Sequence, residues 1–563
     1  MSLHDAVARH VRPGQTLYFG GSMARPNAAM FEVARQFWGK APGFTLVAPA
    51  IANQHAPLIR GGLVDKVISS IHAMTFPTPA PHPLYVETAK AGTVIYENWS
   101  LLTLTKRLMA AAMGLPFLPT RSLSGSDMLA DLSAAGAAAS IRDPFGAGDT
   151  AVVAPLVPDV CFVHALAADP DGNVIICPPL YDGPWPALAA RAVVVTVERI
   201  VSTEALRRRA DLVKIPAERV SAICITPFGG HPNSLPGDAS SGFEGYPDDY
   251  DFLEDLRTAG RTPEALDRWT EEWILGCPDH DAYIAKLGTA RTHALRGRAS
   301  ADGWMQEWAE LGPMSARGDA TDNETHAILA ARVLERRFMT GEIDCILAGL
   351  GISSLAAWMG AMRAMRAGQR VPLMVEAGMY GYVPAPADPF LFNFRNMSLG
   401  LMLADTVTTL GVMTGGAGNR AIGVLGAAQV DRAGNLNTTR LPGMLLTGSG
   451  GANDIGSAAS EVLVTIQHSP RRLVEKVDFI TTPGRAVRTI VTPRGVIERR
   501  GGAYVLAAVI AREGMSLDDL VEAARGASGF DLPVAEDIRL EAVASADEIA
   551  FARQLDPRGL FLG

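Results

Sequence analysis

A chain of 563 residues with 48% hydrophobic and 19% charged side chains is long enough for several cores and is typical of a globular protein. The formal net charge of −9 argues against nucleic acid as a partner, because phosphate binding favours a basic face. No apolar run reaches the roughly 18 residues that a membrane span needs, so we expect no part of the chain in a membrane.

The start of the chain is expected to form an amphipathic helix over 1–11, which does not resemble a signal peptide. The cysteines are dispersed along the chain and show no C-x-x-C spacing. This pattern is typical of buried thiols in a reducing compartment. The cysteines lie at Cys161, Cys177, Cys224, Cys277 and Cys345. We therefore expect a cytoplasmic protein, and no cluster of residues has the spacing of a metal site.

A strand that ends in Gly20 and Gly21 follows, and then a helix over 28–37. Their connection, Gly20-x-Ser22, is similar to the nucleophile elbow G-x-S-x-G with its last glycine replaced. The Asp and His that follow the serine in enzymes with such an elbow do not stand out further along the chain. The loop equally suits close approach of the backbone to a ligand. Gly20, Gly21 and Ser22 are therefore candidate substrate contacts.

Further apolar runs in the first half predict strands over 45–50, 64–71, 151–154, 160–165 and 192–200. The last of these runs is continuous, as in strands buried within a parallel sheet. Residues 93–100 lead into a helix over 101–112 and carry an acid, Glu97, just before it. An acid in that place is favoured by the helix dipole, which would give Glu97 a purely structural role.

The first half closes with a Gly/Pro loop over 225–234, which holds His231. A histidine in such a loop can contact substrate or can support the structure, and we keep it as a candidate substrate contact. Small, charged and polar residues with little β pattern then predict a linker with one short helix. We divide the chain into a domain over 1–293, a linker over 294–320 and a domain over 321–563.

The second half is expected to open with a helix over 324–338 and an apolar strand that ends at Gly349 and Gly351. An amphipathic helix over 355–368 and a second apolar strand over 371–375 follow. Strand, glycine loop, helix and strand in this order make a βαβ unit, which predicts a parallel sheet.

Glu376 ends that second strand, at the edge where open α/β sheets bind their ligands. It has three interpretations. As a strand-end acid it would be solvated or paired with an arginine. As the ribose-binding acid of a dinucleotide site, it would lie roughly 25 residues beyond Gly349-x-Gly351, whose third glycine is missing. As a nucleophile, it would attack an activated acyl carbon, while Gly378 and Gly381 let the backbone approach the substrate.

An internal repeat supports two related lobes. Residues 169–173 (DPDGN) recur as 431–435 (DRAGN), and each copy follows a strand. Asp and Asn would cap the backbone of such a turn, and Gly would take a positive φ. Both halves also open with helix, strand, glycine loop and helix. We therefore predict an α/β fold of two related lobes, each an open, mostly parallel sheet with flanking helices, with the active site between the lobes.

The segment around Glu376 resembles the active-site loop of the family I CoA-transferases, in which a strand ends in Glu-x-Gly before a further Gly and Pro. Here these are Glu376, Gly378, Gly381 and Pro384. The first half resembles the α subunit of such an enzyme, and residues 321 to about 530 resemble the β subunit, fused in one chain. Resemblance is closest to the glutaconate CoA-transferase branch. Its marks are residues 97–100 (ENWS), 114–119 (GLPFLP), 229–232 (GGHP), 448–454 (GSGGAND), 468–472 (HSPRR) and 477–481 (VDFIT).

This resemblance implies an enzyme that moves CoA from an acyl-CoA donor to a small carboxylic or dicarboxylic acid by ping-pong chemistry. Glu376 would form an acyl-glutamyl anhydride and then a glutamyl-CoA thioester. No permanent cofactor is implied, because coenzyme A enters as the acyl-CoA substrate. With an ordinary pKa of about 4.3, Glu376 would be ionised at neutral pH and would need no activating base. We expect the chain to form a homo-oligomer.

Each attack on a carbonyl builds an oxyanion, which backbone N–H groups stabilise. By resemblance, the loops that supply these groups and contact CoA contain Gly349, Gly351, Ile352, Gly378, Gly448, Gly450 and Gly451. The family's Gly-x-Gly-x-Pro loop has Ser353 in place of its proline here.

An alternative within the same fold is a CoA-thioester hydrolase or a ring-opening C–C hydrolase. Relatives of that kind lack the second-half glutamate, and the glutamate matching Glu97 is implicated as their base. This chain has both acids, and the retained Glu376 favours transfer. A nicotinamide-dependent dehydrogenase and a non-catalytic acyl-CoA-binding module are further alternatives, distinguished by nicotinamide titration and by thioester turnover.

Overall fold

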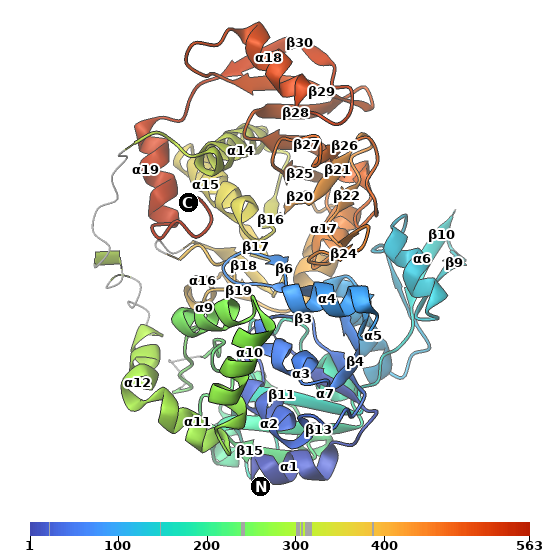
Figure 1. Ribbon diagram of the computed structural model, residues 1–563, viewed down its shortest axis with the longest axis vertical. Helices are drawn as coiled ribbons and strands as arrows, with labels where there is room; N and C mark the ends of the chain where they lie inside the picture. Colours follow the sequence, from blue (N-terminus) through green and yellow to red (C-terminus); the bar gives the residue numbers. More distant parts are fainter. Residues whose placement is uncertain are drawn as a thin grey trace.

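Two α/β lobes, stacked along the long axis of the molecule, make up the chain in the computed structural model (Figure 1). The structure describes residues 1–21, 23–146, 148–237, 242–299, 305, 308–309, 318–384 and 388–563. In Figure 1 the first lobe runs from blue to green and the second from yellow to red, and each is built around its own large sheet. The predicted fold class is confirmed.

The sheet of the first lobe has nine strands, with β11 at a branch point. Its strands are β1 (Thr16–Phe19), β2 (Phe44–Val47), β4 (Val64–Ser69), β7 (Ile95–Asn98), β11 (Val160–Ala168), β12 (Val174–Ile175), β13 (Ala192–Ile200), β14 (Val213–Ile215) and β15 (Ala222–Ile225). Seven of them run parallel in the order β15-β13-β11-β1-β2-β4-β7. The β-branched residues 193–197 of β13 are buried on both faces, as the continuous apolar run predicts.

Helices of the first lobe pack on this sheet, on a small side sheet and on one another (Figure 1). They are α1 (Leu3–His10), α2 (Asn27–Phe37), α3 (Ala56–Arg60), α4 (Pro83–Ala91), α5 (Leu101–Ala112), α6 (Asp127–Ala134), α7 (Trp185–Ala189), α8 (Thr203–Arg207), α9 (Tyr250–Ala259), α10 (Pro263–Thr270), the π-helical η5 (Glu271–Leu275), α11 (His280–Leu287) and α12 (Thr289–Arg298). The helix α5 begins where Ser100 caps it, with the Ser100 side chain accepting a hydrogen bond from Thr103 N–H.

The sheet of the second lobe has ten strands in the order β19-β18-β17-β16-β20-β25-β27-β28-β29-β30. They are β16 (Cys345–Ala348), β17 (Leu373–Val375), β18 (Met379–Tyr382), β19 (Met402–Leu403), β20 (Ala421–Gly426), β25 (Glu461–Thr465), β27 (Val487–Thr492), β28 (Gly495–Arg500), β29 (Ala503–Ile510) and β30 (Val534–Glu541). The five central strands, from β17 to β27, are parallel. Strands added at either edge are mostly antiparallel.

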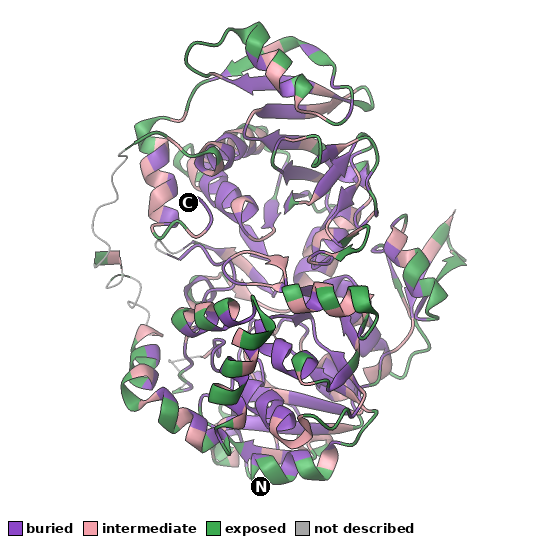
Figure 2. Ribbon diagram, viewed as in Figure 1, coloured by how far each residue is buried: buried purple, intermediate pink, exposed green. Residues whose placement is uncertain are grey.

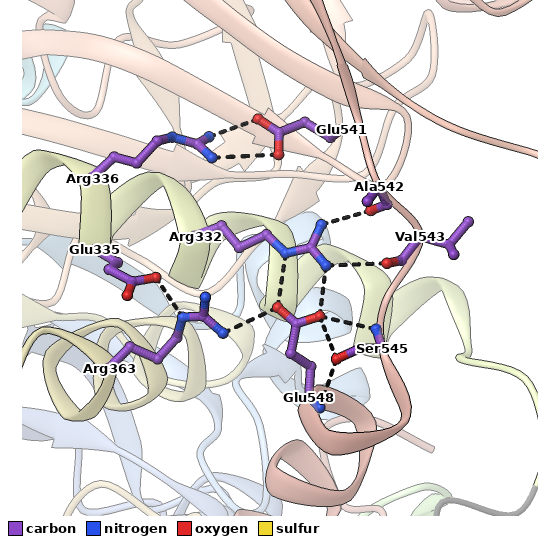
Figure 3. Close-up of polar contacts among 9 residues, drawn as sticks. All are labelled: Arg332, Glu335, Arg336, Arg363, Glu541, Ala542, Val543, Ser545 and Glu548. Carbon is purple, nitrogen blue, oxygen red and sulfur yellow. Dashed lines mark hydrogen bonds and ion pairs between the residues drawn. The ribbon is translucent and has the colours of Figure 1, made fainter. Parts of the chain in front are cut away.

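Helices of the second lobe pack around this sheet. They are α14 (Asp322–Phe338), α15 (Ile352–Arg366), α16 (Phe394–Ser398), the π-helical η6 (Val407–Thr414), α17 (Ala452–Ala458), α18 (Leu517–Gly526) and α19 (Ala546–Leu555). Ion pairs join three of them, because Arg332 of α14 and Arg363 of α15 both bind Glu548 of α19 (Figure 3).

Four small sheets lie outside the two large ones. They contain β3 (Ala50–Ile51), β5 (Ile71–Met74) and β6 (Ala80–Pro81); β8 (Leu118–Thr120), β9 (Ala138–Arg142) and β10 (Asp149–Val153); β21 (Gln429–Asp431), β22 (Leu436–Asn437) and β26 (Leu473–Val474); and β23 (Arg440–Leu441) with β24 (Met444–Leu445). The predicted strand over 151–154 therefore forms β10, in a side sheet that projects from the first lobe (Figure 1).

The repeated turn has nearly the same side-chain hydrogen bonds in both lobes, and only one backbone donor differs. Asp169 accepts from the backbone of Gly172 and Asn173 and from the Asn173 side chain. Asp431 accepts from the backbone of Ala433 and Asn435 and from the Asn435 side chain. The glycines, at 172 and 434, have φ of 112° and 86°. The turn predicted from the sequence is confirmed, and its recurrence supports a duplicated lobe.

The two lobes share a core rather than merely touching. Figure 2 shows buried residues running through both sheets and across the junction, with exposed residues on the outer helices. Met23, Phe76 and Leu101 of the first lobe belong to the same apolar cluster as the central strands of the second. No helix in the described ranges has the length and apolarity to cross a membrane.

The predicted linker is only partly described. The helix α12 continues to Arg298, inside the predicted linker, and α14 begins at Asp322 after its cap, Thr321. Most of 300–317 lies outside the described residues. The division at 293 and 321 remains a prediction.

Candidate active site

Glu376 lies in a tight turn at the carboxyl end of β17. The predicted βαβ unit is confirmed, because β16 and β17 are parallel and α15 connects them. The sequence predicts a glycine loop after Glu376, but the chain turns back at once, and Val375 pairs with Met379 of β18. Gly378 makes this turn with a φ of 107°, in space where a Cβ would overlap with the carbonyl of Ala404.

The backbone of Glu376 is held by two threonines that lie before and within η6. The hydroxyl of Thr406 donates to the Glu376 carbonyl over 2.7 Å, and the hydroxyl of Thr409 donates to it over 3.2 Å. The peptide that carries the carboxylate is therefore fixed on one side, and the side chain extends from a rigid base.

The Glu376 carboxylate faces Gly451. A Cβ at position 451 would overlap with Oε2, so only glycine leaves room there. The N–H of Gly451 donates to the carboxylate. Gly448 and Gly450, just before it, contact Ile71 of the first lobe, and Gly450 N–H donates to the carbonyl of Ser70. Glu376 therefore lies where the two lobes meet.

The environment of Glu376 favours its neutral form. The side chain is half-buried, and burial together with the nearby charge of Asp454 raises its pKa to about 7, although the Gly451 hydrogen bond lowers it. The expectation of an ordinary, fully ionised carboxylate is therefore wrong for this site. A solvated or arginine-paired acid does not fit these surroundings either.

Asp454 connects the site to the first lobe. It lies on α17, and its carboxylate accepts from the hydroxyl of Ser100 over 2.6 Å and from the N–H of Leu102 over 3.0 Å. It thereby caps α5 of the other lobe. Burial raises the pKa of Asp454 to about 6, against the lowering effect of these hydrogen bonds.

Some backbone N–H groups of the predicted oxyanion loops already donate a hydrogen bond within the protein, and others do not. Four glycines of these loops donate to backbone carbonyls of the protein: Gly349 to Val424, Gly378 to Val375, Gly448 to Thr438 and Gly450 to Ser70. Among the described residues, the N–H of Ile352 has no acceptor, since it opens α15 after Gly351 with its φ of 88°. The N–H of Gly351 likewise has no acceptor among the described residues, so Gly351 and Ile352 carry free N–H groups, while the N–H of Gly451 faces the Glu376 carboxylate.

Glu97 lies on β7 and is held by three donors. Lys66 contacts its carboxylate at 2.6 Å, the Trp99 indole N–H donates over 2.7 Å, and Arg107 contacts it at 3.2 Å. Burial alone would raise the pKa of Glu97, but the hydrogen bonds from Lys66 and Trp99 and the two cationic charges outweigh it, and the pKa is lowered. These partners fit the structural interpretation of Glu97.

His231 is buried in a network within the first lobe. Its Nδ1 lies 2.5 Å from the Tyr283 hydroxyl and its Nε2 lies 3.0 Å from Asp249. Burial lowers the pKa of His231 despite the Asp249 contact. Both ring nitrogens are engaged, which fits a supporting role and leaves no ring nitrogen for a substrate.

The glycines of the first loop, Gly20 and Gly21, line a small cavity with Met23. Ser22 lies outside the described residues. Leu180 lines the same cavity, and the next residue, Tyr181, donates through its N–H to the carbonyl of Ala377, the residue after Glu376. The first-lobe loop and the Glu376 turn are thus brought together, as the predicted architecture requires.

Sequence reasoning missed several residues around the site. Asp454 stands in a recognised glycine segment, but its contact with Ser100 depends on how the lobes dock. Thr406 and Asp182 carry no local signal. Among the described residues there is no group of three or more His, Cys, Asp or Glu side chains that could hold a metal ion.

Comparison with known proteins places the chain in a family. The profile of the family described as Coenzyme A transferase matches residues 1–225 and 412–522. The first of the two subunits of glutaconate CoA-transferase from Acidaminococcus fermentans is 30% identical over 311 residues, which are 53% of this chain and 94% of its own length.

A second relative matches through both of its subunits. The first subunit of the 3-oxoadipate CoA-transferase of Pseudomonas knackmussii is 29% identical, over 52% of this chain and 99% of its own length. The second subunit of the same enzyme is 29% identical, over 42% of this chain and 93% of its own length. Two subunits of one enzyme are thus similar to parts of a single chain here.

A solved structure covers nearly the whole molecule. The acyl-CoA transferase YdiF of Escherichia coli O157:H7, in a thioester complex with CoA, aligns over 98% of this chain and 95% of its own, with a TM-score of 0.67 and 16% identity. At that identity the likeness shows the fold alone, and it extends across both lobes.

Proposed function

Because the chain belongs to the coenzyme A transferase family, we propose that it moves CoA from an acyl-CoA to a small carboxylic acid with Glu376 as the nucleophile. One observation carries the assignment of Glu376: a half-buried carboxylate at the carboxyl end of β17 faces the N–H of Gly451 where the lobes meet. The family-level match supports the reaction class, and the geometry supports the choice of residue.

The first half-reaction has two steps. The Glu376 carboxylate attacks the thioester carbonyl, the C–S bond breaks, and CoA leaves as a thiolate from an acyl-glutamyl anhydride. The thiolate then attacks the glutamyl carbonyl, the anhydride C–O bond breaks, and the acyl group leaves as a carboxylate. Glu376 is left as a CoA thioester, and an acceptor acid reverses both steps.

Two features of the site support this chemistry. The N–H groups of Gly451 and Ile352 are the proposed donors to the oxyanions, and loss of one such donor typically costs ~10²–10³ in rate. Burial of Glu376 weakens the solvation of its ionised form, and with a pKa of about 7 the carboxylate is both available and reactive near neutral pH.

The hydrolase alternative asks Glu97 to act as a base. Its carboxylate accepts from Lys66, Trp99 and Arg107, and its pKa is lowered, which makes it a weak base. Transfer through Glu376 is therefore the function that we favour.

Mass spectrometry of the intact protein tests the proposal. Incubation with acyl-CoA alone should add CoA, less one water, to the peptide that contains Glu376. Borohydride should reduce this thioester and hydroxylamine should convert it to a hydroxamate, and initial rates with two substrates should be ping-pong.

Two matched variants sharpen this test. Glu376→Gln should abolish the adduct and lower transfer by at least ~10³-fold, because it removes the nucleophile. Glu97→Gln should lower transfer less. Turnover of a transfer reaction without an adduct on Glu376 would refute the proposed intermediate, and the reverse ranking of the variants would favour the hydrolase.

Cytoplasmic location and homo-oligomeric assembly belong to the same proposal. The dispersed cysteines, all buried and free, support the first. Fractionation of cells and light scattering of the purified chain would test the two statements separately.

A further inference from the structure

A cavity of about 60 Å³ lies beside the first glycine loop. The backbone at Gly20 and Gly21 closes one side, and the segment from Leu180 to Gly183 closes another. Most of the remaining wall is apolar and comes from Met23, Pro26, Phe162, Ile176, Pro186 and Ile215.

Two polar groups in this wall have no hydrogen-bond partner among the described residues. They are the hydroxyl of Tyr18 and Oδ2 of Asp182, on side chains that are 2% and 5% exposed. A buried carboxyl group without a partner is costly, and proteins keep such groups where water or a ligand completes the hydrogen bond. Both residues line the cavity, so a water or ligand inside it can form the missing hydrogen bonds.

The cavity wall is tied to the Glu376 turn by main-chain hydrogen bonds. Tyr181, next to Asp182, donates to the carbonyl of Ala377 over 3.1 Å, and Leu180 donates to Ala404 over 2.7 Å. Thr406 donates to the carbonyl of Tyr181 through its N–H and to the carbonyl of Glu376 through its hydroxyl. The cavity therefore belongs to the surroundings of the nucleophile.

Two residues without the freedom of glycine are strained at this wall. Ala24, which lines the cavity, has a φ of 53°, and Tyr181 has a φ of 57°. Such a conformation is unfavourable for a residue with a Cβ and persists only where the surrounding structure imposes it. The surrounding structure therefore holds both walls of the cavity in these conformations.

We propose that this cavity receives the far end of the substrate's acyl chain and that Asp182 and Tyr18 recognise an uncharged oxygen there, a hydroxyl or a carbonyl. This inference rests on the proposed function. Each recognising group can donate a hydrogen bond to such an oxygen, Asp182 from its neutral carboxyl form, which burial favours by raising the pKa to about 8.

The charge of the wall excludes a second carboxylate. Among the described lining residues there is no Lys or Arg, and both ring nitrogens of His164 are engaged, with Thr196 and Glu198. Arg25 is nearby, but it donates to the Gly21 carbonyl and lies against Gln54. A carboxylate would have no cationic partner here, whereas a neutral oxygen needs none.

The size of the cavity limits the group that enters. The cavity is small but large enough to admit a water-sized group. We therefore expect a short acyl chain with an oxygenated end.

Acyl-CoAs matched in chain length test the inference. The rate constant of adduct formation on Glu376 is measured with butyryl-CoA, 3-hydroxybutyryl-CoA, 4-hydroxybutyryl-CoA, acetoacetyl-CoA and succinyl-CoA. The unmodified enzyme should prefer at least one neutral oxygenated chain over butyryl-CoA by tenfold or more. Asp182→Ala and Tyr18→Phe should each reduce that ratio by about tenfold, because each removes one hydrogen bond.

Two further variants serve as controls. Asp182→Asn keeps a donor in the cavity and should retain more of the preference than Asp182→Ala. Trp185→Phe removes an indole N–H that is also buried and unpartnered among the described residues but is not part of the cavity wall, and the preference should not change.

Three outcomes would overturn the inference. An unchanged ratio in both Asp182→Ala and Tyr18→Phe would show that the cavity does not select the acyl chain. A preference for succinyl-CoA would show that a carboxylate is recognised instead. If no acyl-CoA forms an adduct on Glu376, the proposed function fails, and the inference that depends on it fails too.

Discussion

Glu376 and Asp454 place two carboxylates in one desolvated site. Glu376 is half-buried and its pKa is raised to about 7, while Asp454 is buried and its pKa is raised to about 6. The charge of Asp454 contributes to the raised pKa of Glu376. Groups that interact in this way titrate as a pair, so the pH dependence of the enzyme reports both.

Asp454→Asn should move the acid limb of adduct formation to lower pH. Loss of the negative charge lowers the pKa of Glu376, so more of the nucleophile is ionised at pH 6. An asparagine can still bond to Ser100 and Leu102, which keeps the lobes docked. The rate of adduct formation between pH 5 and 9 is the measurement.

Ser100→Ala is the matched control, because it removes a contact of Asp454 and keeps the charge. An acid limb that stays in place in Asp454→Asn would contradict the coupling between the two carboxylates.

Glu376→Gln should stabilise the fold at pH 8 while it abolishes transfer. The folded-state pKa of about 7 lies above the unfolded value, so ionised Glu376 opposes folding. This penalty develops as pH rises from about 4.5 to 7 and is fully present above it.

We expect a gain of roughly 1–3 kcal/mol for Glu376→Gln at pH 8 and little gain at pH 4.5. Thermal unfolding of both proteins at the two pH values measures it. An equal change at both would show that the effect does not come from titration.

The sequence predicts those residues of the site that have a recognisable pattern in the neighbouring residues, and it misses those that only the fold brings there. Glu376 is found because the apolar strand and the glycines are local to it. Its raised pKa comes from burial and from the charge of Asp454, which only the fold brings near. No motif in the neighbouring sequence marks Asp182 as a residue of the site, because strands from elsewhere in the lobe bury it.

At the scale of elements, α14, α15 and α19 are joined by Glu548 (Figure 3). Its carboxylate binds Arg332 through two contacts of 2.8 and 2.6 Å and Arg363 at 3.1 Å, and it caps α19 through Ser545. Burial acts to raise the pKa of Glu548, but hydrogen bonds from Arg332 and Ser545 outweigh it and lower the pKa to about 2.

Glu548→Gln should therefore destabilise the second lobe by about 1–3 kcal/mol at pH 7. The folded pKa of about 2 lies below the unfolded value, so the stabilisation is present above about pH 4.5 and is lost as pH falls through 2. Thermal unfolding at pH 7 and pH 4 measures the difference from the unmodified chain.

Glu475→Gln is the control, because Glu475 forms an exposed pair with Arg432, with side chains 61% and 66% accessible. Such a pair contributes little, and its loss should not change the unfolding temperature measurably. Equal effects of the two variants would contradict the special role of the buried network.

Element prediction succeeds where periodicity is strong and fails where tertiary pairing decides. The helix α5 (Leu101–Ala112) and the strand β13 (Ala192–Ile200) match their predicted bounds. By contrast, β18 (Met379–Tyr382) contains Gly381, so its residues suggest a loop, and only pairing with β17 and β19 makes it a strand.

At the scale of the whole molecule, the lobes are joined by directional contacts close to the site. Asp454 binds Ser100, Asn453 accepts from the N–H of Leu123, and Asp127 exchanges two hydrogen bonds with Ile480. Since the site uses both lobes, neither should react alone.

Co-expressed fragments 1–299 and 318–563 should bind each other and form the CoA adduct on Glu376, because the two separate subunits of a relative match parts of this chain. Each fragment alone should be inactive. Co-purification and adduct mass are the measurements, and fragments that fail to associate would contradict the two-domain division.

The glycine at 451 also fixes which oxygen of Glu376 takes part in the reaction. Because Oε2 lies against the backbone there, the proposed mechanism would present Oε1 to the acyl carbon, and each turnover would pass that atom to the departing acid. Oε2 remains with the protein through every cycle. After many turnovers with an acceptor acid labelled with ¹⁸O at both carboxylate positions, the peptide that contains Glu376 should therefore carry one heavy oxygen. A carboxylate that rotates freely between cycles, exchanging Oε1 and Oε2, would carry two.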